Sequence, residues 1–398
     1  MVLKPSGLLE LIFQPWPILW AYVLLGLLCL ICFTRWGFPS AIPRVIWLPL
    51  LAWFAWQFIA ATQSVNPGLS GKVVFYFATI LLLFLLGLSA GRSGPGLPPH
   101  FWWPILGCLA WVLWLGFEQH HGGLEATRKE FYSLPDWQSY PADYLKKLQS
   151  NRIFSSLVYP NAFAGLLLLI LPASFLALIQ LTARLPRPVR ITIIGLVAYL
   201  AAACFYWTGS KGGWLIALGL AAIWALHLPF ARRLKIALVA VLLLAGLSVF
   251  SVRFADYFRR GATSASARFI YWQGALKIAQ ANPVFGTGPG TFAIPFKAIK
   301  PAEAEMAKLV HNDYLEQLSD SGLVGFIAYS TAISALLVLL YRKSSKNTQS
   351  ITFLIWIGLL GWAAQSLIEF GLYIPALAWP AFFFFGYLLS YDEPAHSG

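Results

Sequence analysis

Long apolar stretches restrict this chain more than any other feature. A helix that crosses a bilayer needs about 20 mainly apolar residues. Eleven stretches are candidates: 16–34, 45–63, 73–91, 101–117, 160–182, 191–209, 213–230, 235–252, 322–341, 350–368 and 374–391. Hydrophobic residues make up 59% of the 398 residues and charged residues only 11%, so a soluble enzyme is excluded. The sequence predicts an all-α, polytopic integral membrane protein with about 11 transmembrane helices.

We expect residues 1–398 to form a single transmembrane domain, because no internal repeat or low-complexity tract interrupts the pattern. Two polar segments, 118–159 and 253–321, are too long to be turns. A further short apolar piece at 8–15, followed by Pro15 and Pro17, is either an interfacial helix or half of a twelfth span.

The charges of the connecting segments predict the orientation. One alternating set of loops carries twelve cations: Arg35, Arg44, Arg92, Arg184, Arg187, Arg190, Arg232, Arg233, Lys235, Arg342, Lys343 and Lys346. The short loops of the opposite set carry two, Lys72 and Lys211. The positive-inside rule places the first set in the cytoplasm. Segments 118–159 and 253–321 are therefore predicted to face outward, away from the cytoplasm.

The second long segment is also basic. Residues 253–310 contain eight cations and three anions, on the side where the positive-inside rule does not ask for positive charge. This excess indicates an anionic ligand next to the outer leaflet, and a surface that faces lipid headgroups is the alternative. Gly286, Gly288 and Gly290 form a G-x-G-x-G pattern without the strand and helix of a nucleotide site, so we interpret it as a tight turn.

Three cations sit where a loop meets an apolar stretch: Arg152, Lys211 and Arg268. A cation at that depth is costly unless it has a partner, so each is a candidate for ligand binding. Snorkelling of the side chain to the headgroups is the alternative interpretation. Arg268 also opens an amphipathic run that includes Tyr271 and Trp272.

His311 is the candidate for proton transfer. It lies at the entry of the stretch that begins at 322, and helical spacing puts it on one face with Leu315. Histidine is the side chain best suited to accept a proton near neutral pH. Asp313, two residues on, is also a candidate cap near a helix start.

Several blocks together resemble the bacterial O-antigen ligase and polymerase superfamily, over about 150–390. The blocks are Arg152 with Pro160-Asn161, Thr208-Gly209-Ser210-Lys211-Gly212-Gly213-Trp214, Ala267-Arg268 with Trp272, the glycine run at 286–290, His311-Asn312-Asp313-Tyr314-Leu315, and Ser366-Leu367-Ile368-Glu369-Phe370. Lys211 stands where the family usually has Arg, and Glu369 stands where it commonly has Asp. Tyr159 replaces the first Asn of the usual Asn-Pro-Asn.

The resemblance implies a GT-C-type glycosyltransferase that uses no nucleotide sugar. Such an enzyme moves a glycan from undecaprenyl diphosphate to an acceptor hydroxyl on the periplasmic face. His311, as general base or as the group that orients the acceptor hydroxyl, and Arg268, facing the leaving diphosphate, are the predicted catalytic residues. Arg152, Lys211, Asp313, Tyr271 and Trp272 are the predicted substrate-binding residues. Asp313 would orient His311 or contact acceptor sugar, and Tyr271 and Trp272 would stack on sugar rings, with burial at the membrane interface as the alternative. This mechanism requires no metal and no other cofactor.

The acceptor stays open at this point. It is lipid A-core in a ligase, a repeat unit in a polysaccharide polymerase, and a protein in an O-oligosaccharyltransferase. The expected partners are the lipid-linked donor, that acceptor and the bilayer, and not nucleic acid. A non-catalytic transporter of anionic or lipid-linked substrate is the alternative from another class. It predicts mid-span charges and inverted repeats, whereas here most charge lies in loops and at span ends, with Glu369 the exception.

Overall fold

The computed structural model is all-helical in the parts of the chain that it describes: residues 18–36, 44–92, 97–140, 145, 148–157, 159–259, 261–345 and 347–391. The longer helices are α2 (Ile18–Trp36), α3 (Arg44–Thr62), α4 (Pro67–Gly91), α5 (Pro99–Glu118), α8 (Pro160–Leu181), α9 (Arg187–Trp207), α10 (Lys211–Leu226), α11 (Arg232–Arg253), α13 (Thr263–Ala281), α15 (Asp313–Ser344), α16 (Ile351–Gln365) and α17 (Pro375–Ser390). Shorter elements are a π-helical turn (Gln119–Gly123), α6 (Leu124–Tyr132), α12 (Ala255–Arg259), α14 (Ala293–Ile299) and the 3-10 turns η2 (Trp137–Ser139) and η3 (Gly371–Tyr373).

Each of the eleven apolar stretches contains a helix, as hydropathy predicted. Seven helical segments are long and apolar enough to cross a membrane: Arg44–Thr62, Pro67–Gly91, His100–Tyr132, Pro160–Leu181, Arg187–Trp207, Arg232–Arg253 and Asp313–Ser344. The other four stretches contain shorter apolar helices, Ala21–Ile31, Lys211–Leu226, Ile351–Gln365 and Pro375–Ser390. The chain is therefore a polytopic membrane protein. The predicted piece at 8–15 lies outside the described residues.

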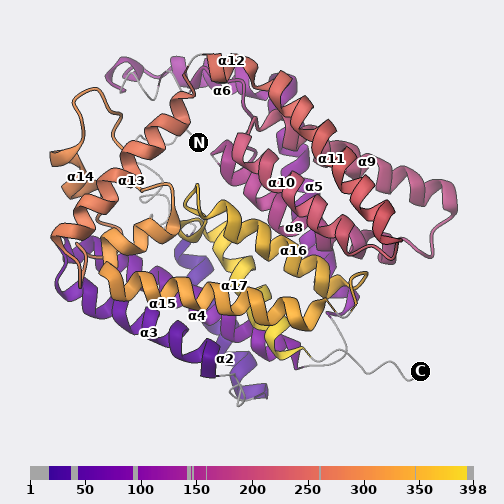
Figure 1. Cartoon of the computed structure of the whole chain (residues 1–398), viewed down its shortest axis with the longest axis horizontal. Helices are drawn as coiled ribbons and strands as arrows, with labels where there is room; N and C mark the ends of the chain where they lie inside the picture. The colour runs from indigo at the N-terminus through magenta and orange to yellow at the C-terminus, as the bar shows by residue number, and fades with distance from the viewer. Residues whose placement is uncertain are drawn as a thin grey trace.

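The tightest packing in the bundle is between α4 and α17, which lie together near the centre of Figure 1. A Cβ added at Gly87 would lie 2.0 Å from the Phe383 carbonyl oxygen, and one added at Gly386 would lie 2.0 Å from the Phe84 oxygen. No side chain fits at either position, so glycine is required at both. Small residues of this kind let the backbones of two membrane helices approach, and the close approach adds dispersion contact.

Two helices on the opposite flank face outward. In the most apolar 18-residue window of each helix, the share of buried residues is only 11% for α9 and 6% for α11. The same share is 67% for α4 and 72% for α8. In Figure 1, α9 and α11 form the upper right edge of the molecule. Apolar side chains that face away from the protein suit contact with lipid, so this edge is a membrane-facing surface of the bundle.

One end of the bundle gathers the long polar segments. Val65 N–H donates to Thr287 O at 2.9 Å, Ile153 N–H to Trp207 O at 3.3 Å and Asp313 N–H to Ser366 O at 2.8 Å. These bonds join the connections that follow α3, α5, α9, α11 and α16. Figure 1 shows α6, α12, α13 and α14 along the upper and left rim. Because the chain runs back and forth, the loops rich in cations lie at the other end.

The glycine pattern at 286–290 forms the tight turn that the sequence predicted. Gly286, Gly288 and Gly290 have φ of 65°, 104° and 77°, where a side chain is unfavourable. The turn packs against the first part of α15, because Gly288 N–H donates to Asp320 O at 2.8 Å. Helix α15 is broken nearby at Gly322, with φ 66° and ψ −171°. Its first two turns therefore belong to the polar end, and the apolar span follows the break.

Candidate active site

His311 lies just before α15 and not within it. Its φ is 57°, in the left-handed region that is unfavourable for a side chain. The helix begins at Asp313, because Asn312 is its N-cap and accepts from the amides of Tyr314 and Leu315. The expectation that helical spacing pairs His311 with Leu315 is therefore wrong. Instead the imidazole packs among aromatic rings, with the ring centroid of Phe370 at 4.7 Å.

Glu369 is the residue on which the site converges. Its side chain is only 7% exposed and lies between α16 and α17. One oxygen, Oε2, lies 3.1 Å from His311 Nδ1. The other, Oε1, accepts from Arg268 Nη2 and, at 2.5 Å, from Asn161 Nδ2. Burial raises the pKa of Glu369, but the hydrogen bond and charge of His311 and the charge of Arg268 outweigh it, so the pKa lies below its usual value.

Arg268 reaches this carboxylate from α13. Its Nη2 donates to Glu369 and its Nε donates to Ile368 O at 3.0 Å, so one planar guanidinium bridges two neighbouring residues. Burial lowers the pKa of Arg268, but the charge of Glu369 and its hydrogen bond raise it above the usual value. The side chain stays 18% exposed. Arg268 is therefore a fixed cation with part of its surface open to a ligand.

Arg152 joins the same unit through an amide. Its Nη2 donates to Asn161 Oδ1 at 2.5 Å and its Nε to Thr208 O at 2.6 Å. The loop that carries it is held by Gln119, whose Oε1 accepts from Ser155 N–H at 2.7 Å. Burial lowers the pKa of Arg152, a shift that the nearby Glu369 partly opposes. Arg152, Asn161, Glu369, Arg268 and His311 thus form one connected hydrogen-bonded unit.

Lys211 lies at the same end, and the described structure shows no hydrogen bond or ion pair from its ammonium to that unit. Its Nζ is 4.0 Å from the ring centroid of Tyr257 and 5.2 Å from that of Phe254. These are cation–π contacts, which hold a charge loosely and without a fixed direction. Ser210 caps the helix that Lys211 opens, by accepting from Gly213 N–H at 3.2 Å.

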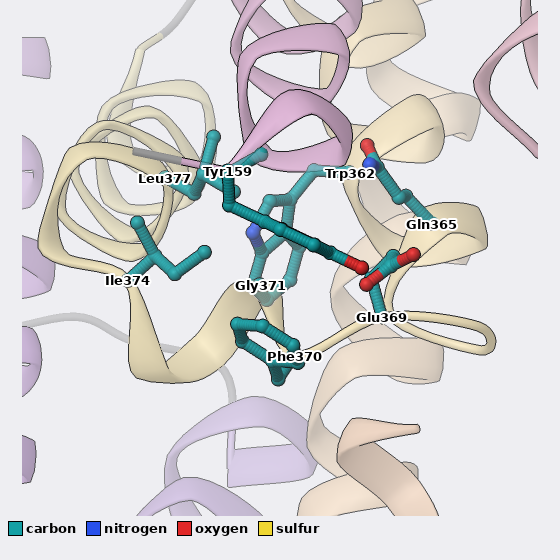
Figure 2. A pocket seen from close by; sticks show the side chains of 9 residues that line it. Tyr159, Trp362, Gln365, Glu369, Phe370, Gly371, Ile374 and Leu377 are labelled. Carbon is teal, nitrogen blue, oxygen red and sulfur yellow. The ribbon is translucent and has the colours of Figure 1, made fainter. Parts of the chain in front are cut away.

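A small cavity of about 10 Å³ lies beside these groups. Figure 2 shows the Tyr159 side chain stretched across it, with its hydroxyl toward Glu369 and with Phe370 and Trp362 on either side. This space is about enough for one water molecule. The cavity is lined by Tyr159, Ala162, Trp362, Gln365, Glu369, Phe370, Gly371, Ile374 and Leu377.

Residues 196–330 match the family model described as O-antigen ligase. About a third of the chain is therefore similar to that family. An uncharacterized protein of Haemophilus influenzae is 30% identical over 207 residues, which cover 45% of this chain and 50% of that protein. The chain thus spans about half the length of this curated relative.

The matched stretch contains Lys211, Arg268 and His311, whereas Arg152 and Glu369 lie on either side of it. Glu369 still reaches the site because it bonds to His311 and Arg268, and Arg152 is joined to Glu369 through Asn161. The family resemblance expected from the sequence is therefore confirmed over this stretch. The groups that complete the site come from the parts of the chain before and after it.

The three other predicted substrate-binding residues lie close to His311. Tyr271 is buried, with its ring centroid 5.8 Å from that of His311. Trp272 Nε1 donates to the His311 carbonyl oxygen at 3.4 Å. Asp313 is fully buried, and its Oδ2 accepts from Leu372 N–H at 2.8 Å. In this structure Asp313 holds the turn that bears Glu369, and it has no surface open to a ligand.

Sequence reasoning missed three residues of this site: Tyr159, Asn161 and Glu369. A signal existed for Glu369, because a lone carboxylate in an apolar stretch is a functional candidate by default. The Asn161 amide was visible only as part of a family block, and nothing marked it as the link between two cations. Tyr159 carries no signal, since a tyrosine at a span end is ordinary.

Proposed function

We propose that this protein is a membrane glycosyltransferase that moves a glycan from undecaprenyl diphosphate to a hydroxyl of lipid A-core, on the periplasmic face of the bacterial inner membrane. The observation that carries the proposal is the Glu369 carboxylate, which joins a histidine and an arginine directly and a second arginine through Asn161. Proton acceptor and phosphate-binding cations thus form one unit, as transfer from a diphosphate requires.

The periplasmic orientation is supported by the charges of the two ends. The end opposite the site carries the cation-rich loops, which the positive-inside rule assigns to the cytoplasm. The site then faces the periplasm, with about eleven helices embedded in the membrane and the segments 118–159 and 253–321 outside it. A lipid-borne diphosphate at the outer leaflet reaches this end without crossing the bundle.

His311 acts as the general base in the proposed reaction. Its Nδ1 faces the Glu369 carboxylate, so this nitrogen carries the ring hydrogen and Nε2 keeps a free lone pair. The acceptor hydroxyl oxygen attacks the anomeric carbon while Nε2 takes its proton. The bond between that carbon and the diphosphate oxygen breaks, and undecaprenyl diphosphate leaves with the electron pair. Glu369 stabilises the imidazolium that forms.

The cations stabilise the leaving group. Negative charge grows on the diphosphate oxygens as the bond breaks, and Arg268, Arg152 and Lys211 lie at the same end to receive it. Such preorganised donors are typically worth a few kcal/mol each in the transition state. These residues supply the charge stabilisation without a metal ion, so we expect transfer to persist in EDTA. A strict requirement for Mg²⁺ or Mn²⁺ would contradict this assignment of the cations.

Transfer by purified protein tests the proposal. The donor is a labelled glycan on undecaprenyl diphosphate, and lipid A-core, free repeat units and a protein acceptor are compared. We expect His311→Ala to lower turnover by ~10²–10⁴-fold and to leave donor binding nearly unchanged. His227→Ala is the matched control, because His227 pairs with Tyr341 at the other end of the bundle. Wild-type turnover by folded His311→Ala overturns the mechanism.

A labelling experiment tests the orientation separately. Ser139 and Ser264 are exposed residues of the two long segments. Each is changed to Cys in a background whose native cysteines are replaced, and an impermeant reagent is added to cells with a permeabilised outer membrane. We expect both positions to be labelled. Protection of both would place the site in the cytoplasm.

A further inference from the structure

The first two turns of α15 carry three carboxyl groups on one face. Asp313, Glu316 and Asp320 are spaced three and four residues apart, so they line one side of the helix. All three are fully buried. Buried carboxyl groups are costly unless they make hydrogen bonds, so each is expected to have a definite partner.

Each of these carboxyl groups accepts a backbone N–H from a different segment. Asp313 Oδ2 accepts from Leu372 at 2.8 Å, Glu316 Oε2 from Val310 at 2.5 Å and Asp320 Oδ2 from Gly290 at 2.6 Å. The three segments are the turn that follows Glu369, the loop that precedes α15 and the glycine turn at 286–290. The second oxygen of each carboxyl is buried without a hydrogen-bond partner among the described residues.

The bond from Val310 to Glu316 matters most, because Val310 directly precedes His311. The left-handed backbone of His311 persists only if the surroundings hold it. Glu316 holds the chain on the amide side of His311, and Trp272 Nε1 holds the carbonyl oxygen of His311 itself. Together these two contacts set the direction of the imidazole toward Glu369.

We propose that Glu316 is a positioning residue that aims His311, and that it acts as a hydrogen-bond acceptor, with no need for charge. This inference rests on the proposed function of His311. The described residues show no ion pair with Glu316, so no cation requires it to be ionised. An amide oxygen at the same position can accept the same N–H. An apolar side chain of similar length cannot.

Three variants of the whole purified protein separate these possibilities. Glu316→Gln keeps an acceptor oxygen, and we expect its kcat to stay within ~3-fold of wild type. Glu316→Met fills the space without an acceptor, and we expect its kcat to fall by ~10²-fold with donor KM nearly unchanged, because a 1 Å misplacement of a catalytic group costs about that much. Gln317→Met is the control, since Gln317 is equally buried but bonds to Trp53 and Tyr373.

Coupling to His311 gives the decisive readout. If Glu316 acts through the imidazole, Glu316→Met combined with His311→Ala loses no more activity than His311→Ala alone. Gln317→Met combined with His311→Ala should multiply the two losses instead. Multiplied losses for Glu316→Met, or a Glu316→Gln variant as impaired as Glu316→Met, would overturn the proposal.

Hydrogen exchange distinguishes failure of this inference from failure of the proposed function. In a peptide that covers 307–315, we expect faster amide exchange in Glu316→Met than in Glu316→Gln. Equal exchange in both variants overturns the positioning contact. Faster exchange in Glu316→Met together with wild-type turnover by His311→Ala leaves the contact in place and instead overturns the catalytic role of His311.

Discussion

The two sides of Glu369 hold their cations in different ways. On the α13 side, Arg268 bonds directly to the carboxylate and to the Ile368 carbonyl oxygen, so its guanidinium has one orientation. On the α10 side, the ammonium of Lys211 lies over the rings of Tyr257 and Phe254. Arg152 is intermediate, because Asn161 separates it from the carboxylate.

This difference indicates a division of labour within the proposed site. A bonded guanidinium has fixed geometry and suits the recognition of one phosphate. An ammonium over aromatic rings is free to follow its ligand. Arg268 bonds directly to the Glu369 carboxylate, Arg152 is joined to it through Asn161, and Lys211 lies at the same end without a bond to it, so cations outnumber the carboxylate at this end. Substitutions are therefore expected to weaken activity in the order of their connection to Glu369.

Removal of Glu369 is expected to have the largest effect, because it frees both His311 and Arg268. We predict that Glu369→Ala lowers single-turnover transfer by ~10³–10⁴-fold, as loss of the carboxylate that orients a catalytic histidine does in other enzymes. Glu369→Asp keeps the charge on a shorter stem and should lose far less. Glu118→Ala, at an exposed carboxylate of the same end, serves as the control. Near-normal transfer by Glu369→Ala would show that the connected unit is not catalytic.

Changes at Arg268 are expected to rank second. Arg268→Ala should lower transfer by ~10²–10³-fold, the usual cost of one donor that stabilises developing charge. Arg268→Lys should restore only part, because one ammonium cannot span both Glu369 and the Ile368 oxygen in the geometry of the planar fork. Donor binding and single-turnover rates, measured on each variant, check this. Full recovery by Lys would remove the distinction between the two sides.

Much of the fold could be predicted from hydropathy, because a bilayer permits few structures other than helices. The break in α15 at Gly322 could not be predicted, because it depends on a contact with a turn that is distant along the chain. A Cβ at Gly322 would lie 2.1 Å from the Val284 carbonyl oxygen of that turn. Nor was the start of α15 placed correctly. A signal existed in Asn312, which is a favourable N-cap residue, but the helical pattern of the following residues was extended one step too far.

The site was predicted as a list of residues and not as an arrangement. His311, Arg268 and Arg152 were selected by their chemistry and by their places at the membrane surface. Their connection runs through Glu369, which is 58 residues from His311 along the chain and 101 from Arg268. Tertiary packing alone creates such contacts, so no local pattern indicates them. For the same reason the sequence did not show that Asp313 is turned inward.

The pH dependence of stability tests the direct bonds of Glu369 to His311 and Arg268, with a smaller expected effect than the activity measurements. The pKa of Glu369 lies below its usual 4.5, because His311 and Arg268 favour the ionised form more than burial opposes it. A group whose pKa is lowered on folding stabilises the protein above its unfolded pKa, and this contribution is lost as pH falls through the folded value.

We therefore predict that Glu369→Gln melts at a lower temperature than wild type. This gap in melting temperature should persist from pH 8 to pH 5. The gap should be on the order of 5 °C, since a buried charge loses its partner, and it should shrink only below pH 4.5. Thermal unfolding in detergent across this range is the measurement. Glu118→Gln is the control and should show no gap. A gap that closes between pH 7 and 5 would contradict the lowered pKa.

Lys211 should be the most tolerant of the cations, because its contacts with Tyr257 and Phe254 impose no fixed direction. We predict that Lys211→Arg changes transfer by less than ~3-fold, since Arg keeps the charge and stacks well on aromatic rings. Lys211→Ala should weaken donor binding by ~10-fold, about one charge-assisted contact. Lys235→Ala removes a cation at the opposite end and controls for net charge. A Lys211→Ala variant as inactive as Arg268→Ala would mean that the loosely held cation is as important as the bonded one, and the two sides of Glu369 would then have to be treated as equivalent.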